Sequence, residues 1–253
     1  MTPASRIVSL IKLSPVSVPR RVCGPAPIMP SFEQPWRPQL DWNTPAGRVL
    51  DRLIEALPAD RPWEIIVFGS SPLQLGIDAT FLSGDVDVIP QEDITEYCRA
   101  AGLLKGQAPI YVEPCTVTAF TASPDWFVRA CQCRRRHVLL ILPHPIDILV
   151  SKIKRLEEKD VRAFKMVREK TGHPTEAELL AALRRVVDIY RPSFDEESAG
   201  NPVHNTQVLW HELFGRDVNV RELIIAPALA ERRRNYGGEG GGLKQALGNL
   251  PPE

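Results

Sequence analysis

Hydrophobic and polar residues follow two different periods along this chain, and each period predicts its own kind of element. Apolar residues at every third or fourth position predict an amphipathic helix over residues 45–57, with Thr44 as its N-cap. The continuous apolar run at residues 65–68 is typical of a strand covered on both faces, and Gly69-Ser70 ends it abruptly. Residues 85–89 begin with alternating acidic and apolar side chains, which predicts a second strand with both acids on one face.

Helices and strands are predicted to alternate through the first half of the chain. The stretch between the first two strands, residues 71–84, is expected to contain a short helix. Beyond the second strand the pattern predicts one helix and then three strands, at residues 91–103, 110–113, 116–120 and 137–142 in that order. Four or five strands interleaved with helices predict an α/β or α+β sheet.

After Pro143 the pattern becomes helical. One long helix is predicted over residues 145–170, with Gly172 just past its end. Three more helices are predicted, over about residues 175–190, 203–214 and 219–235, with a loop at residues 192–202. The first and the last of these three begin with capping signatures, Thr175-Glu-Ala-Glu178 and Asn219-Val-Arg-Glu222.

These patterns divide the chain into four segments. We expect a Pro-rich arm, an α/β core, a helical C-terminal region and a Gly-rich flexible tail, at residues 1–43, 44–145, 146–236 and 237–253 in that order. Proline at this density fits neither a helix interior nor a central strand, so the arm is expected to be disordered. Trp36 and Trp42 are candidates to pin its end onto the core. Met29 is an alternative start to Met1, which the intact mass of the native protein would decide.

Composition excludes some classes of function. The 31 basic residues balance the 31 acidic ones, so the chain lacks the cationic excess that coats nucleic acid non-specifically, although a local basic groove stays open. The five cysteines are odd in number and contain no Cys-x-x-Cys pair, which favours reduced thiols in a cytoplasmic protein. No apolar run approaches the roughly 20 residues of a membrane span, so no membrane partner is expected.

The second predicted strand carries the candidate chemistry. Asp85 and Asp87 are two residues apart, so in a strand both side chains point to the same face. Two carboxylates held side by side repel each other, and a divalent cation relieves the repulsion. Their hard oxygen ligands suit Mg²⁺ or Mn²⁺.

Three segments of this chain resemble a known superfamily. Gly69-Ser70 followed by Asp85-x-Asp87 in a strand resembles the signature of the polymerase-beta-like nucleotidyltransferases. Two later segments are similar to bacterial nucleotidyltransferase-like proteins of the abortive-infection toxin type and their uncharacterised relatives; these are Pro145-Ile-Asp-Ile-Leu-Val-Ser-Lys152-Ile-Lys-Arg155-Leu-Glu-Glu-Lys159-Asp160 and Pro124-Asp-Trp126-x-x-Arg129. The resemblance covers about residues 60–170. It implies an α+β fold with a nucleotidyltransferase-like mixed sheet flanked by helices and a helical C-terminal part.

The resemblance also implies an activity. We expect an enzyme that moves a nucleoside monophosphate from an NTP such as ATP to a hydroxyl on RNA (for example tRNA), a protein or a small molecule. Two Mg²⁺ or Mn²⁺ ions would stabilise the attacking and leaving oxygens. The likeness to toxin-type proteins further implies a place in a toxin–antitoxin or phage-defence system, with a cognate antitoxin or toxin protein as partner.

Each part of that chemistry has candidate residues. Asp85 and Asp87 would hold metal, and Glu113 is the candidate third carboxylate because it lies in the strand predicted at residues 110–113; Asp125 and Asp147 are alternatives. Gly69 and Ser70 would hold a phosphate group. Lys152 would contact the triphosphate, with Arg155 on the same helix face, and Asp160 would act as a supporting or catalytic acid.

Other interpretations stay open beside this one. The chain could be a catalytically degenerate scaffold that binds a nucleotide or a protein, or a metal-dependent phosphohydrolase that uses the same acids. Lys152 could simply be a solvated helix residue, and Asp160 could pair with Lys152 or with Lys159. Cys131-x-Cys133, followed by three arginines, lacks the second ligand pair of a zinc site, so a basic strand edge or hairpin is favoured. Trp126 is expected in the core or cleft wall, with base stacking as the alternative.

Overall fold

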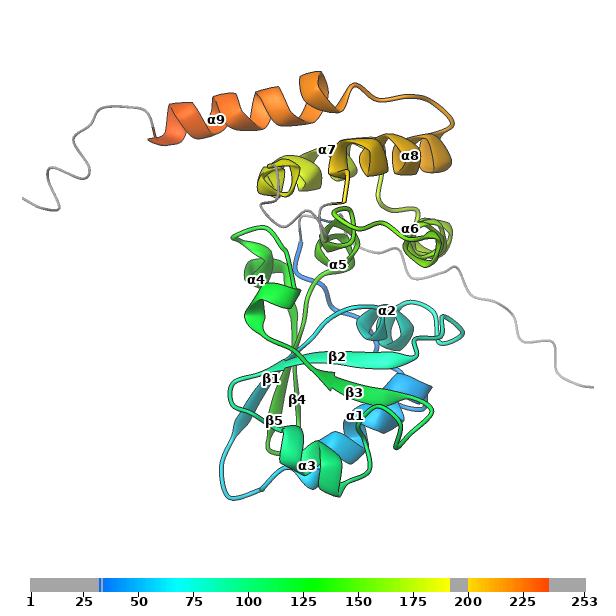
Figure 1. Cartoon of the computed structure of the whole chain (residues 1–253), viewed down its shortest axis with the longest axis vertical. Helices are drawn as coiled ribbons and strands as arrows, with labels where there is room; N and C mark the ends of the chain where they lie inside the picture. The colour runs from blue at the N-terminus through cyan, green and yellow to red at the C-terminus, as the bar shows by residue number, and fades with distance from the viewer. Residues whose placement is uncertain (1–31, 33, 192–199, 237–253) are drawn as a thin grey trace, which may run out of the picture.

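A five-stranded mixed sheet forms the centre of the computed structural model, which describes residues 32, 34–191 and 200–236 (Figure 1). The strands are β1 (Trp63–Val67), β2 (Asp85–Pro90), β3 (Tyr111–Pro114), β4 (Cys131–Arg135) and β5 (Val138–Leu142). The helices are α1 (Pro45–Ala56), α2 (Ser71–Gly76), α3 (Thr95–Ala100), α4 (Trp126–Arg129), α5 (Pro145–Ser151), α6 (Glu158–Thr171), α7 (Glu176–Arg185), α8 (Pro202–Phe214) and α9 (Ala226–Tyr236). The fold is therefore mixed α+β, as the sequence predicts.

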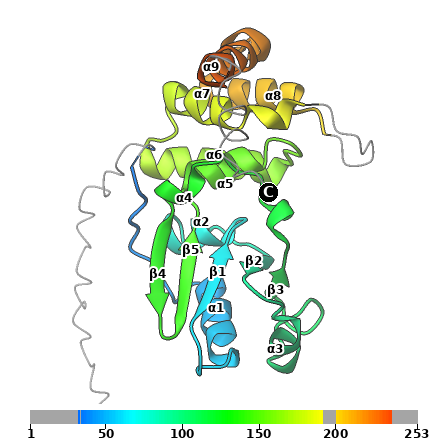
Figure 2. The same cartoon turned by 90° about the vertical axis from the view of Figure 1, so that its left-hand side faces the viewer.

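The strands lie in the order β3-β2-β1-β5-β4. Strand β1 runs antiparallel to β2 and parallel to β5, while β2 and β3 are parallel and β4 and β5 form an antiparallel hairpin. The hairpin agrees with the interpretation of the Cys131-x-Cys133 segment as a strand edge. Figures 1 and 2 both show helices α5 to α9 gathered at one end of the sheet.

Two hydrophobic clusters stabilise the fold. In the first, α1 and α3 cover one face of the sheet, where Ile65, Val67, Val86 and Val88 are buried. In the second, helices α5 to α8 pack on one another around Phe164 and Trp210. Because Val86 and Val88 face the first cluster, the alternation of β2 turns Asp85 and Asp87 to the opposite face of the sheet.

The N-terminal segment links the two clusters, so the expectation of disorder does not hold for Phe32 and residues 34–43. The ring of Phe32 is buried in the helical cluster, and its backbone N–H donates to Glu178 Oε1 at 3.2 Å. Trp36 is buried in the sheet cluster, as proposed for a residue that pins the arm. The rest of the predicted arm, the predicted tail and residues 192–199 lie outside the described residues.

Four predicted elements differ from the structure. The strand predicted over residues 116–120 is a 3₁₀ turn (Val117–Ala119), whose Val117 is 73% exposed, so this apolar residue has no core to enter. The helix predicted over residues 91–103 spans only α3. Helix α7 ends at Arg185 and a separate 3₁₀ turn (Val187–Tyr190) follows, while a π-helical turn (Arg221–Ile225) precedes α9.

The long helix predicted over residues 145–170 is also wrong, because the chain breaks between α5 and α6. Leu156 adopts a positive φ of 28°, which an α-helix does not accommodate. A new helix then begins with a capping box, in which the Asp160 carboxylate accepts the backbone N–H of Glu157 at 3.0 Å. Apolar periodicity continues across the break because Ile153 remains in the helical core. Within the described residues, no helix is both long and apolar enough to cross a membrane.

Candidate metal site

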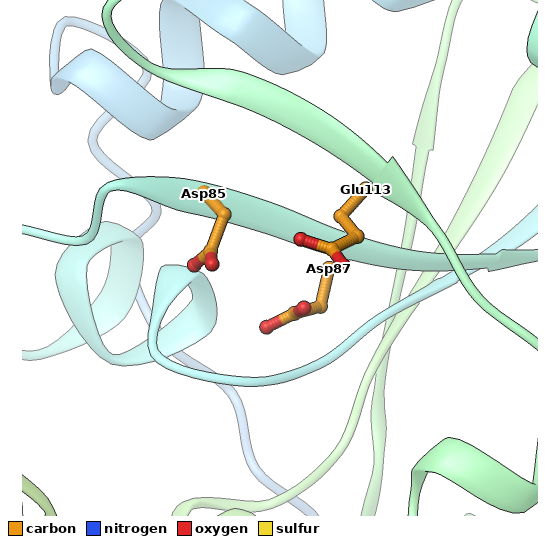
Figure 3. A group of neighbouring side chains, drawn as sticks. All are labelled: Asp85, Asp87 and Glu113. Atoms are coloured by element: carbon orange, nitrogen blue, oxygen red, sulfur yellow. The ribbon is translucent and has the colours of Figure 1, made fainter. Parts of the chain in front are cut away.

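Three carboxylates meet on the sheet face opposite α1. Asp85 and Asp87 project from β2, and Glu113 projects from the neighbouring strand β3, where the parallel register places it opposite Asp87 (Figure 3). One oxygen atom from each of the three carboxylates lies within 4.8 Å of the other two. Within the described residues, this is the only group of three or more His, Cys, Asp or Glu side chains close enough to share a metal ion.

The electrostatics of the group favour a cation. Burial, followed by the negative charges of Asp85 and Glu113, raises the pKa of Asp87 to about 6, although the positive charges of Lys152 and Arg155 act to lower it. Burial and the repulsion among the three acids together therefore keep a proton on Asp87 in mildly acidic solution. A divalent ion would replace that proton. The all-carboxylate donor set fits a hard ion such as Mg²⁺ or Mn²⁺.

Gly69 gives the Asp87 carboxylate the space that it occupies. The glycine has a φ of +68°, a region that residues with a side chain rarely adopt. A Cβ atom at this position would lie 1.9 Å from Asp87 Oδ2. In this structure the group that lies close to Gly69 is the site's own carboxylate, and the phosphate contact expected at Gly69 stays a prediction.

Two serines support the other acid, and the sequence pattern singled out neither of them. Ser71 Oγ donates to the backbone oxygen of Asp85 at 3.0 Å, and Ser83 Oγ donates to Asp85 Oδ1 at 3.1 Å. Ser70, the serine predicted to hold phosphate, lies at the N-cap of α2, half-buried, and its side chain makes no capping hydrogen bond. Only the packing of α2 against β2 distinguishes the roles of Ser70 and Ser71.

Lys152 and Asp160 form a buried ion pair. Lys152 Nζ donates to Asp160 Oδ1 at 2.8 Å, and the two side chains are 10% and 1% exposed. Asp160 therefore does not join the three carboxylates, because its oxygens bind Lys152 and the start of α6. Arg155 is largely exposed and pairs with Glu157 at 3.4 Å. Lys152 and Arg155 come near Asp87 because of the turn between α5 and α6, and not because they share a helix face. Their positive charges act to lower the pKa of Asp87.

Asp125 and Asp147, the alternative third ligands, bind Arg129 instead. The guanidinium group of Arg129 is buried and donates to Asp147, Asp125 and Ser123. Burial alone would lower the pKa of Arg129, but the hydrogen bonds with Asp147 and Asp125 raise it, so the group stays charged. The Pro-x-Trp-x-x-Arg segment thus ties α4 to the first turn of α5.

Known proteins offer no independent guide to this site. Comparisons of the chain with protein-family models, with curated proteins and with solved structures find no match. The resemblance described above therefore stays a prediction, and function has to be inferred from the side chains of the site themselves.

Proposed function

We propose that this chain is a metal-dependent nucleotidyltransferase with a nucleotidyltransferase-like mixed sheet. The observation that carries the proposal is the meeting of Asp85, Asp87 and Glu113 on two paired strands, directly beside the Gly69 turn. A third acid on the strand next to the Asp-x-Asp strand is what the resemblance implies, and the register of β2 and β3 supplies one. The order strand, Gly-Ser turn, short helix and acidic strand agrees with the same expectation.

The reaction would join a hydroxyl oxygen to the α-phosphorus of an NTP while the bond from that phosphorus to pyrophosphate breaks. Divalent ions on the three carboxylates would stabilise the charge on the attacking and leaving oxygens. Arg155, exposed beside the site, would contact the triphosphate. Lys152 would add positive charge from its fixed position, and Asp160 would hold it there. The proton of the hydroxyl would leave to water or to a carboxylate of the site.

One observation favours the alternative of a degenerate, nucleotide-binding scaffold. The ammonium group of Lys152 is already paired with Asp160 and nearly buried, so it is not free to follow a phosphate group. Under this alternative the site would bind a nucleotide with its metal and release it unchanged. By analogy with toxin-type proteins, either form would act in a toxin–antitoxin or phage-defence system, on an RNA, protein or small-molecule partner.

A labelling experiment tests the proposal. The protein would be incubated with each labelled NTP, Mg²⁺ and bulk tRNA or cell extract, beside the double variant Asp85→Asn, Asp87→Asn. Asp60→Asn is the matched control, because this acid is exposed and precedes β1, at the end of the strand away from Gly69. Label should enter an acceptor with the wild type and with Asp60→Asn, and should be lost with the double variant.

The other results separate the alternatives. Mg²⁺-dependent NTP binding without incorporation of label would support the degenerate scaffold. Release of free phosphate without incorporation would support a phosphohydrolase. If neither binding nor transfer depends on Asp85 and Asp87, the assignment of a nucleotide site to these acids is wrong.

A further inference from the structure

A row of aromatic rings begins beside the three carboxylates. Phe68 follows β1 directly, and its backbone N–H donates to the carbonyl oxygen of Asp87 at 3.0 Å. This bond continues the register that pairs Val67 with Val88, so Phe68 lies opposite Asp87. Residues directly opposite each other on neighbouring strands project from the same face of a sheet. The ring of Phe68 therefore lies on the face that carries the acids.

The row leads from this face outward to solvent. The ring of Phe120 lies 5.5 Å from that of Phe68, Trp126 lies 5.5 Å from Phe120, and Phe127 lies 5.7 Å from Trp126. Exposure rises along it, from 7% at Phe68 through the half-buried Phe120 and Trp126 to 48% at Phe127. The inner ring is thus part of the core, while the outer rings offer surface to a ligand.

The segments around the acids also expose other apolar side chains. Leu82 precedes β2 and is 71% exposed, Val117 follows β3 and is 73% exposed, and Val128 next to Phe127 is 72% exposed. Single exposed apolar residues are ordinary, but Leu82 and Val117 flank the two strands that carry the acids, and Val128 lies in α4 beside the outer rings of the row. Such a border fits a ligand with a flat apolar part and a charged part.

Arg129 holds the row in place. Its guanidinium group joins Ser123 and Asp125, which precede α4, to Asp147 in α5, and its backbone oxygen accepts the N–H of Trp36 at 2.9 Å. This buried network fixes the segment that carries Trp126 against both the N-terminal segment and the helical region. A fixed ring stacks on a ligand with little loss of conformational entropy.

We infer that Phe120 and Trp126 bind the nucleobase of a nucleotide whose phosphates are held at the three carboxylates. Every nucleobase has a π-face, so aromatic stacking accepts any base, while the metal site would hold the phosphates. The base could belong to a free NTP or to the end of a single-stranded RNA, which offer the same chemistry. The inference rests on the proposed function for the phosphate half of the site, but stacking itself can be measured separately.

Binding measurements on Trp126 variants test the inference. Calorimetry would compare Mg²⁺–ATP, Mg²⁺–tripolyphosphate and a short single-stranded RNA on the wild type, Trp126→Leu and Trp126→Phe. Trp42→Leu is the matched control, because Trp42 is also half-buried but packs at α1 and beside Arg135. Trp126→Leu should weaken the binding of ligands that contain a base by about 5- to 150-fold, while Trp126→Phe and Trp42→Leu should bind them nearly as the wild type does.

Tripolyphosphate separates loss of stacking from loss of fold, since it has no base. Its affinity should be the same in all four proteins. If Trp126→Leu binds ATP and RNA as tightly as the wild type, or loses tripolyphosphate to the same extent, the inference is overturned. A wild type that binds ATP no better than tripolyphosphate overturns it too, while leaving the metal site intact.

Conversely, RNA binding that depends on Trp126 without any Mg²⁺–tripolyphosphate binding would support the aromatic site and contradict the proposed function. Whether ATP or RNA shows the Trp126 effect identifies the source of the base.

Discussion

Replacement of Gly69 by alanine should separate the stability of this protein from the metal affinity expected of the three carboxylates. Gly69 and Gly172 both have positive φ angles, +68° and +77°, so alanine is strained at either position. Their surroundings differ. A Cβ atom on Gly172 would meet nothing within 4 Å, whereas one on Gly69 would lie 1.9 Å from Asp87 Oδ2. Gly172→Ala is therefore a control for the backbone strain alone.

The expected magnitudes follow from these contacts. Left-handed backbone costs a residue with a side chain about 1–2 kcal/mol, so both variants should lose roughly that much free energy of unfolding. In Gly69→Ala the carboxylate of Asp87 must also retreat by about 1.5 Å or more before it reaches ordinary contact distance. Because this atom is the end of a side chain, it can rotate away at modest cost. The displaced oxygen can then no longer share an ion with Asp85 and Glu113.

Two measurements on each variant check this reasoning. Denaturant unfolding should show similar destabilisation for both, within about 1 kcal/mol. Calorimetric titration with Mn²⁺ should show a loss of affinity of about 10-fold or more in Gly69→Ala only. This is the size of loss seen when the orientation of a metal ligand is disturbed. Wild-type affinity in Gly69→Ala would refute the packing of Asp87 against this turn. An equal loss in Gly172→Ala would attribute the effect to general destabilisation.

Three further predictions concern ionisation and packing. Asp87→Asn should stabilise the metal-free protein by up to about 3 kcal/mol at about pH 8 and by much less at about pH 4. The reason is that the pKa of Asp87 in the folded protein is about 6, above the ordinary 3.8, so the wild type loses stability as the pH rises between these two values. Denaturant unfolding at both pH values checks this, and an effect independent of pH would contradict it. Arg129→Met leaves Asp147 buried without its partner and should lower the free energy of unfolding by about 3–5 kcal/mol in the same assay. The exposed Arg136→Met should lower it by less than about 1 kcal/mol, and equal losses would mean that the buried pair is not formed. Phe32→Ala should lower the free energy of unfolding, measured by thermal denaturation, by about 3–5 kcal/mol because the Phe32 ring is buried in the helical cluster. A loss near zero would show that the N-terminal segment does not pack in this way.

Several parts of the site follow from local sequence pattern. The placement of Asp85 and Asp87 on one face needs only the two-residue period of a strand, and the structure confirms the strand. The turn at Gly69 follows from a buried apolar run that stops at a residue free to adopt positive φ. Glu113 could be named as a candidate because its strand was predictable. The contact between Glu113 and Asp87 could not be derived from local pattern, since it depends on which strands pair and in which register.

Other features needed contacts between residues far apart in sequence. The break between α5 and α6 is hidden from periodicity because the apolar residues on both sides enter the same cluster. The pairing of Lys152 with Asp160 depends on that break. The role of Arg129 depends on Asp147, which lies on another helix 18 residues away.

Local sequence pattern was enough to predict the strand that carries Asp85 and Asp87, the class of ion that such oxygen ligands would suit, and the apolar side chains that cover the sheet. These are consequences of backbone geometry and side-chain chemistry over a few residues. The three-dimensional packing of the chain was needed to show which third acid meets this pair, which cations lie nearby and which aromatic rings border the site. These features depend on strand order, strand register and burial, which arise from contacts between segments that are far apart in the sequence.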